Sequence, residues 1–149
     1  MLISTRSRYG LRALVHLART DRKSPVSLGG IADIEEIPIR YLEQIFGRLR
    51  SAGIVKGRRG PGGGYVLCKK PSDISLLDVI RVLETEFFHT NCMLLCPDSN
   101  VKNEEKTKGC AREEICPTRR LWSDIKGICE SYLVNNTLSD LAGGSLEMG

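Results

Sequence analysis

The chain has 149 residues, of which 41% are hydrophobic, and its formal net charge is +4. This length fits one domain or a small domain with an extension, and the hydrophobic content is enough for a packed core, which excludes a disordered protein. The sequence shows neither a signal peptide after Met1 nor an apolar run of about 18 residues, so we expect a cytoplasmic protein with no membrane-spanning segment.

The charge is divided unevenly along the chain. Residues 1–70 carry 14 Lys and Arg against 5 Asp and Glu, whereas residues 71–149 carry 8 against 13. Chance segregation on a solvated surface is the weaker interpretation because the contrast is large. The sequence therefore predicts that the N-terminal half binds a polyanion.

Two helices are predicted before residue 36. The first covers residues 6–19, with Ser4 or Thr5 as its cap. Its apolar stripe, spaced as on one helical face, consists of Leu11, Leu14, Val15 and Ala18. The second covers residues 28–35, with Ser27 as its cap and with Ile31 and Ile34 turned inward.

A third helix is predicted over about residues 39–52, after Pro38 and before Gly53, residue types that suit the start and the end of a helix. Its apolar face consists of Leu42, Ile45, Phe46 and Leu49, and its polar face of Arg40, Glu43, Gln44, Gly47 and Arg48. Arg, Gln and Glu are the types that hydrogen-bond guanine, adenine and cytosine. The second and third helices thus form a helix–turn–helix candidate, although an ordinary solvated helix face is the alternative.

Residues 58–65 read RRGPGGGY, between two short runs that favour β-strands. A phosphate-binding loop is excluded because no Gly-Lys-Ser/Thr, no G-x-G-x-x-G and no helix follows the glycines. The pattern predicts a β-hairpin, and a hairpin directly after a helix–turn–helix is a wing. Arg58 and Arg59 would supply its charge for phosphates or a narrow minor groove.

Beyond Pro71, a helix is predicted from a capping box at Ser75 to about Glu84, and a long helix over residues 112–134. The long helix has an apolar stripe of Leu121, Ile125, Ile128, Cys129 and Tyr132, widened by Trp122. A single helix with such a stripe needs a partner, and the simplest one is the same helix of a second chain. A last helical turn is expected from Thr137.

Four of the six cysteines fall within residues 92–116. Cysteine in a reducing compartment is more often a ligand or a reactive thiol than half of a disulfide. Cys92, Cys110 and Cys116, with Cys96 as a further candidate, would suit zinc or an iron–sulfur cluster. Cys68 and Cys129 fit the alternative of small hydrophobic side chains.

These motifs together resemble the IscR-type family of bacterial winged-helix regulators, named for the iron–sulfur cluster regulator. The matching segments are RYGLRAL at 8–14, YLEQIFGRLRSAGIV at 41–55, RGPGGGYVL at 59–67, CPTRRLW at 116–122 and NNTLSDL at 135–141. The resemblance covers essentially the whole chain. It implies a homodimer that binds a palindromic operator, with the third helix in the major groove and the wing arginine in the minor groove.

Site residues follow from the resemblance by position. It implies DNA contacts by Arg40, Tyr41, Glu43, Gln44, Arg48, Arg58, Arg59, Gly62 and Gly63. In the family's namesake, the residue matching Glu43 helps to separate two operator classes. The family also implies that Cys92, Cys110 and Cys116 hold a cluster, with two-iron two-sulfur favoured over four-iron four-sulfur.

The fourth ligand is where the sequence departs from the family. The namesake has a histidine at the position of Arg119, and other branches borrow a residue from the partner's first helix, where one branch has an acid and this chain has Arg8. Cys96, His89 and His16 are the candidates that the sequence offers. A branch concerned with cysteine metabolism lacks a cluster, and the cysteine-rich loop argues against membership in it.

We therefore expect a mainly α fold with a small β-hairpin wing. The expected divisions are a winged helix–turn–helix DNA-binding domain at 1–84, a cluster-binding loop at 85–111, a dimerisation helix and C-terminal segment at 112–142, and a flexible tail at 143–149. The hypothesis is a transcription regulator modulated by an iron–sulfur cluster. Its alternative is a winged-helix DNA-binding protein with a structural zinc or thiol site. We expect no enzyme, because no catalytic constellation surrounds the two histidines.

Overall fold

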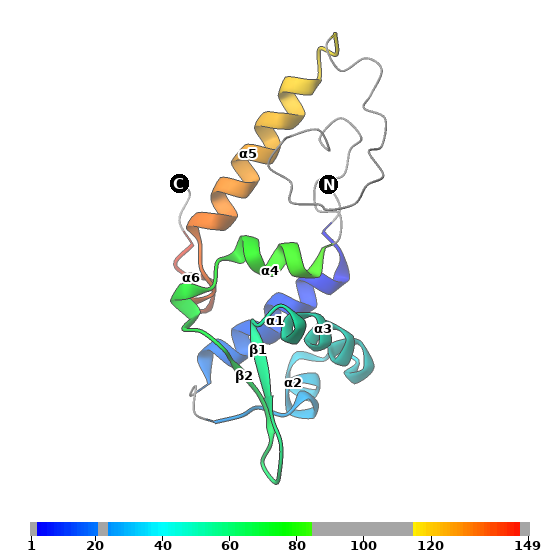
Figure 1. The fold of residues 1–149 in the computed structure, drawn as a ribbon, viewed down its shortest axis with the longest axis vertical. Helices are drawn as coiled ribbons and strands as arrows, with labels where there is room; N and C mark the ends of the chain where they lie inside the picture. The colour runs from blue at the N-terminus through cyan, green and yellow to red at the C-terminus, as the bar shows by residue number, and fades with distance from the viewer. Residues whose placement is uncertain (1–2, 21–23, 85–114, 147–149) are drawn as a thin grey trace.

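The computed structural model describes residues 3–20, 24–84 and 115–146 (Figure 1). Its elements in chain order are α1 (Thr5–Arg19), α2 (Leu28–Glu35), α3 (Ile39–Ser51), β1 (Val55–Arg58), β2 (Gly64–Leu67), the 3₁₀ helix η1 (Pro71–Asp73), α4 (Leu76–Leu83), α5 (Arg119–Asn135) and α6 (Leu138–Gly143). The predicted fold class, mainly helical with one small antiparallel hairpin, is confirmed. None of the helices described is long and apolar enough to cross a membrane.

The core lies where α1, α3 and α4 pack against one another. The predicted apolar face of α3 is confirmed, since Leu42, Ile45, Phe46 and Leu49 are all fully buried. The buried face of α4 consists of Leu76, Leu77, Val79, Ile80 and Leu83. Serine caps begin three of the helices: the side chains of Ser4, Ser27 and Ser75 accept hydrogen bonds from backbone amides at the starts of α1, α2 and α4. These caps satisfy donors that would otherwise have no partner within the helix.

The buried faces of α1 and α2 differ in part from the predicted ones. The fully buried face of α1 consists of Ser7, Gly10, Ala13, Leu14 and Leu17, whereas Leu11, Val15 and Ala18 are partly buried at its edge. Small residues hold the centre because α4 packs so closely there that a Cβ atom on Gly10 would collide with Leu83. On α2, Ile31 is buried as predicted, but the side chain of Ile34 is 65% exposed.

The wing is a two-stranded hairpin in which Val55 pairs with Leu67 and Arg58 with Gly64. Its tip turns through Gly60 and Gly62, whose φ angles of 106° and 72° strain any residue with a Cβ atom. An isolated bridge attaches the hairpin to the segment before α2, where Val26 and Tyr65 exchange both backbone hydrogen bonds at 3.0 and 2.8 Å. The wing is therefore tied to the helix–turn–helix and not only to its neighbours in sequence.

Helix α5 begins at Arg119, so the prediction of a helix from residue 112 was wrong over residues 115–118, while residues 112–114 lie outside the described residues. Pro117 accounts for the later start, because a proline disfavours helical geometry at the residue before it. In Figure 1, α5 extends away from the body at the end opposite to the wing tip. Its C-terminal end is joined to the body by a bridge between Ser75 and Thr137 and by hydrogen bonds of 2.9 Å from Leu76 N to Asn136 O and from Leu138 N to Ile74 O.

Candidate nucleic-acid interface and cysteine site

The outer face of α3 carries the polar side chains that the sequence singled out. Arg40, Glu43, Gln44 and Arg48 are exposed, and Gly47 is partly exposed. Because the opposite face is buried in the core, this surface is held in one orientation with respect to the body. The chain begins α3 after Pro38, with no side-chain cap among the described residues and no acid in the first turn. The first turn of α3 presents Ile39 and Arg40 to the outside, since both residues are exposed.

Tyr41 differs from its neighbours on α3. Its ring is partly buried and packs edge-to-face on Tyr9 of α1, with ring centroids 5.8 Å apart. The guanidinium of Arg12 lies 5.9 Å from the centre of the Tyr9 ring. Tyr41 therefore helps to hold α3 on α1.

The wing carries the remaining predicted DNA contacts. Arg58 ends β1, and Arg59, Gly62 and Gly63 lie in the turn, where Arg59 is exposed. A Cβ atom on Gly63 would lie 2.5 Å from the carbonyl oxygen of Arg58, so the turn can close tightly only with glycine there. Thin backbone and charge at the tip are the properties that a wing needs to enter a groove.

Tyr65, a residue whose role the sequence did not reveal, connects the wing to α3. Its ring packs on Phe46 with centroids 4.8 Å apart and planes at 67°. This contact, together with the backbone bridge to Val26, sets the position of the arginines relative to the outer face of α3. No local pattern could have found it, because Tyr65 and Phe46 meet only in the folded chain.

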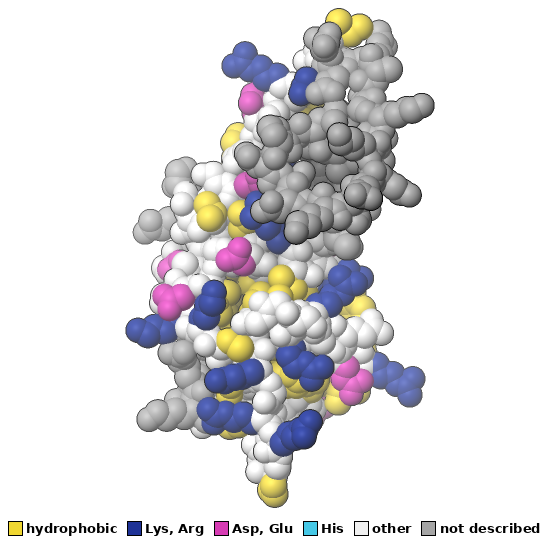
Figure 2. All heavy atoms as spheres, in the orientation of Figure 1, with side chains coloured by type: hydrophobic (Ala, Val, Ile, Leu, Met, Phe, Trp, Pro, Cys, Tyr) yellow, Lys and Arg dark blue, Asp and Glu magenta, His cyan; other side chains and the backbone are white. Residues whose placement is uncertain are grey.

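Positive charge dominates this part of the surface. Figure 2 shows Lys and Arg side chains gathered around the hairpin and the adjoining body, with fewer Asp and Glu among them. The exposed basic residues between positions 40 and 70 are Arg40, Arg48, Arg50, Lys56, Arg58, Arg59, Lys69 and Lys70. Such a patch attracts the phosphates of nucleic acid.

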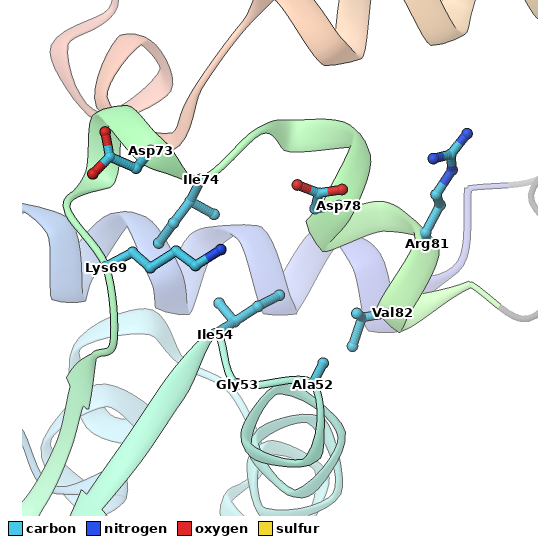
Figure 3. Close-up of a pocket in the computed structure, with 9 residues that line it drawn as sticks. All are labelled: Ala52, Gly53, Ile54, Lys69, Asp73, Ile74, Asp78, Arg81 and Val82. Carbon is cyan, nitrogen blue, oxygen red and sulfur yellow. The ribbon is translucent and has the colours of Figure 1, made fainter.

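Two hollows border α3. A broad, open one of about 710 Å³ is lined by Gln44, Gly47, Arg48, Ser51, Ala52 and Val82, so it continues the outer face of the helix. A smaller one, of about 280 Å³, lies between the end of α3, the base of the wing and α4. In Figure 3 the aliphatic chain of Lys69 extends across it near Ile54 and Ile74, while Asp73 and Arg81 point outward. The smaller hollow adds no side chain from the outer face of α3.

An ionic cluster joins α1 to the end of α2. Arg12 Nε lies 3.1 Å from Glu35 Oε2, and the same guanidinium donates to the Glu35 carbonyl oxygen. His16 Nδ1 lies 3.6 Å from Glu35 Oε1. His16, a candidate for a borrowed fourth ligand, therefore faces the helix–turn–helix of its own chain.

A second set of contacts joins the start of α1 to the end of α4. The Ser4 amide donates to Glu84 Oε1 at 2.8 Å, and Arg6 donates to the Leu83 carbonyl oxygen at 3.0 Å. Burial works to raise the pKa of Glu84, but hydrogen bonds from Ser4, the nearby Ser7 hydroxyl and the charge of Arg6 outweigh it and lower the pKa. Ser7 Oγ itself is buried and has no hydrogen-bond partner among the described residues, so Ser4 supplies the clearer of the two contacts to Glu84.

Of the four cysteines predicted as ligands, Cys116 alone lies in the described part, and Cys92, Cys96 and Cys110 lie outside it, as does His89. Cys116 is partly exposed just before α5, with its Sγ 3.3 Å from Thr118 Oγ1. Arg119, where the namesake has a histidine, is exposed and donates its backbone N–H to the Cys116 carbonyl oxygen at 3.3 Å. The described residues 3–20, 24–84 and 115–146 bring together no group of three metal-ligating side chains.

The predicted apolar stripe of α5 is uncovered within the described chain. Leu121, Trp122 and Ile128 are exposed, while Ile125, Cys129 and Tyr132 are partly buried. None of the 17 residues of this helix is buried by the rest of the structure as described. Cys129 carries a free thiol on this stripe, and Cys68 carries another at an exposed position just after β2, at the base of the wing.

The sequence matches known proteins over nearly its whole length. A family model described as Rrf2, iron-dependent transcriptional regulator, matches residues 3–144. The HTH-type transcriptional regulator IscR of Serratia proteamaculans is 33% identical over 141 residues, which cover 95% of this chain and 79% of the relative. The HTH-type transcriptional regulator CymR of Bacillus subtilis is 38% identical over 142 residues, which cover 95% of this chain and 90% of the relative.

Solved structures show the same similarity. The structure of CymR, the global cysteine regulator of B. subtilis, matches 97% of this chain and 98% of its own with a TM-score of 0.71 at 38% identity. The structure of T. potens IscR matches 97% of this chain and 88% of its own with a TM-score of 0.73 at 32% identity. With a helix–turn–helix followed by an arginine-bearing wing, and with a family model that spans residues 3–144, the chain belongs to the Rrf2 family of DNA-binding, winged-helix transcriptional regulators.

Proposed function

We propose that the protein is a homodimeric regulator that binds a palindromic operator and whose binding is modulated by an iron–sulfur cluster. The observation that supports operator binding is the joint placement of two groups of side chains. Arg40, Glu43, Gln44 and Arg48 share the outer face of α3, and the wing with Arg58 and Arg59 is held against that helix through Tyr65 and Phe46. In this arrangement α3 enters the major groove, Arg59 enters the minor groove, and Gly62 and Gly63 keep the wing tip thin.

Gel-shift titrations at fixed salt test these roles. We expect Arg59→Ala to weaken operator binding and Gln44→Ala to relax base preference, by about 1–3 kcal/mol for each lost contact. Arg120→Ala is the matched control, because that arginine lies on α5 with a side chain that is 93% exposed. Wild-type affinity and specificity in both Arg59→Ala and Gln44→Ala would overturn the proposed roles.

The uncovered stripe of α5 supports the homodimer. A second copy of the helix would cover Leu121, Trp122 and Ile128, which are exposed in the described part of the chain. Two copies related by a twofold axis would present two α3 helices to two half-sites. A palindromic operator is the DNA counterpart of that symmetry.

The family match and the cysteine cluster of residues 92–116 support the cofactor. We assign Cys92, Cys110 and Cys116 as its ligands, with Cys96 as the first candidate for the fourth. The described member of this set, Cys116, fits such a role because its sulfur is partly exposed at the start of α5 and not enclosed in the core. When bound, the cluster would supply thiolate-ligated iron that responds to iron supply, redox state or nitric oxide, and a two-iron form is favoured over a four-iron form.

The chain itself provides a route from the cysteines to DNA. Cys116 immediately precedes α5, and α5 is joined to the body at its other end by the Ser75–Thr137 bridge and by an ion pair of 3.4 Å between Arg81 and Glu130. A change at the start of α5 would therefore alter how two copies of α5 pack, and with it the spacing of the two α3 helices. A coupling of about 1–3 kcal/mol is enough for a switch. Equal operator affinity and equal site preference with and without the cluster would overturn this coupling between the cluster and DNA binding.

The cofactor is tested by the visible absorption spectrum of protein purified without air, with iron, sulfide and zinc analysis. Bands between about 300 and 500 nm with matching iron and sulfide would support the cluster. Colourless protein that stays colourless after reconstitution would contradict it. The similarity to CymR, named as a cysteine regulator, favours a second candidate in that case: a winged-helix regulator with a zinc or thiol site. One tightly bound zinc per chain would distinguish the zinc form.

A further inference from the structure

An aliphatic side chain stands exposed at the start of α3. Ile39 is the first residue of the helix, and 46% of its surface is exposed. Side chains of a helix lean toward its N-terminus, so Ile39 extends the outer face at the end that leads into a groove. Ile39 does not contribute to the buried face of α3, which is formed by other residues.

Ile39 lies in line with a residue that can read bases. Positions four apart share one helix face, so Ile39, Glu43 and Gly47 follow one another along α3. Arg40 and Gln44 form the neighbouring row, and all four side chains in the two rows are exposed. The apolar surface of Ile39 is exposed to water in the free protein. A bound partner that covers this side chain would remove that surface from water, which is favourable.

The major groove offers one apolar feature to such a side chain. Thymine carries a 5-methyl group there, and apolar side chains contact it, whereas the other three bases present hydrogen-bonding groups. In helix–turn–helix proteins the N-terminal residues of the second helix are those that contact base edges. Ile39 has the chemistry and the position for this contact.

We propose that Ile39 is a specificity-determining residue that contacts the 5-methyl group of a thymine in each half-site. The inference rests on the proposed function, since it requires α3 in the major groove. The spacing between Ile39 and Glu43 along α3 also determines where the thymine lies. One helical turn is about 5.4 Å and base pairs are about 3.4 Å apart, so the thymine is one or two base pairs from the base that Glu43 contacts.

The experiment begins with selection of operators from random DNA duplexes by the full-length chain. Each conserved thymine of the selected half-site is then replaced by uracil, which removes the methyl group and leaves every hydrogen-bonding group unchanged. At one position we expect the replacement to weaken wild-type binding about three- to fivefold, the effect of one methyl-sized apolar contact. Ile39→Ala should bind the thymine and uracil duplexes equally.

Ile34→Ala is the matched control. Ile34 is also an exposed isoleucine of the helix–turn–helix, but it lies on α2, the first helix of the motif, which in such proteins crosses the DNA backbone. This variant should keep the wild-type difference between thymine and uracil. Both variants remove exposed side chains, so both should fold, and their thermal unfolding is compared with that of the wild-type chain.

The possible results distinguish the role of Ile39 from operator binding itself. A selection that yields no preferred sequence would overturn both. A selected operator that is indifferent to uracil at every thymine would overturn the role of Ile39 and leave operator binding in place. A uracil effect that persists unchanged in Ile39→Ala, or that disappears equally in Ile34→Ala, would also overturn the role of Ile39.

Discussion

Helices α3 and α5 have similar patterns and opposite environments. Both carry an apolar stripe along one face, but four residues of α3 are buried and none of the 17 residues of α5 is buried by the part of the chain that the structure describes. The stripe of α3 meets α1 and α4, whereas α5 contacts α4 but leaves Leu121, Trp122 and Ile128 of its stripe exposed in the described part of the chain. Amphipathic pattern thus tells which face of a helix is apolar, and the fold alone tells what covers it.

The attachments of the two helices differ in the same way. Contacts hold α3 along its length, from Tyr41 on Tyr9 to Phe46 on Tyr65. Among the described residues, the ion pair and the backbone hydrogen bonds that join α5 to the body lie toward its C-terminal end, at Glu130 and just after the helix at Asn136. One helix is built to present a fixed surface, and the other is anchored at one end, which suits a link between the cysteine site and the body.

Removal of the largest buried side chain of α3 should have the largest effect. We expect Phe46→Ala to lower the free energy of unfolding by about 3–5 kcal/mol, because it removes a fully buried ring and its contact with Tyr65. Urea unfolding at several protein concentrations measures this, and the loss should be the same at each. A loss below about 1 kcal/mol would mean that α3 is not held by its buried face.

A charge on the stripe of α5 should act on association and not on the fold of one chain. We expect Ile128→Asp, at a side chain 69% exposed, to convert a dimer to a monomer and to weaken operator binding about 10- to 100-fold, since burying an unpaired carboxylate is costly. Ser123→Asp adds the same charge at an exposed polar position of α5 and is the control. Light scattering and gel shifts give both readouts. Unchanged mass in Ile128→Asp would contradict the proposed α5 interface.

Local patterns predicted the elements that local forces determine. The buried face of α3, the Ser27 cap and the hairpin with its glycine turn follow from residues near one another in sequence, and all three are present. The buried face of α1 was predicted less well, since a periodicity count favours Leu11 over Gly10. The close approach of Leu83, 73 positions away in the chain, makes the glycine the better packed residue.

The site was predictable in its polar residues and less so in its supports. Arg40, Glu43 and Gln44 are exposed as expected, but their roles in base reading stay predictions, as do the division into domains and the ligand set. The links that hold the wing against α3 and the segment before α2, Tyr65 on Phe46 and the bridge to Val26, join distant segments and leave no local signature. Exposure of Ile34 and Ile39 likewise depends on what the folded chain fails to cover.

The contacts of Glu84 should stabilise the fold in a pH-dependent way. We expect Glu84→Gln to cost about 1 kcal/mol, the scale of a hydrogen bond to a charged group that is partly exposed. Because the pKa of Glu84 is lowered in the folded state, its contribution is present above the ordinary pKa of a glutamate and is lost as the pH falls through the lowered value. Urea unfolding between pH 3 and 7 measures this. A variant as acid-sensitive as the wild-type chain would contradict the role of Glu84.

Gly47→Ala has the smallest expected effect, and it should change stability and operator binding in opposite directions. A Cβ atom on Gly47 would have no described atom within 4 Å, so nothing that the structure describes requires glycine there. We expect Gly47→Ala to stabilise the chain by about 0.5–1 kcal/mol, because alanine is the better helix former. If the glycine instead allows close approach of DNA, the same variant should bind the operator severalfold more weakly.

Gly127→Ala on α5 provides the matched control, because Gly127 is also an interior helical glycine with no described atom within 4 Å of an added Cβ. Both variants should be more stable than the wild-type chain by similar amounts in urea unfolding. Gly47→Ala alone should lose operator affinity, provided that light scattering shows the same mass for both. Equal operator binding by the two variants would mean that the outer face of α3 meets its partner no more closely at Gly47 than α5 does at Gly127, and that only the first turns of α3 lie in the groove.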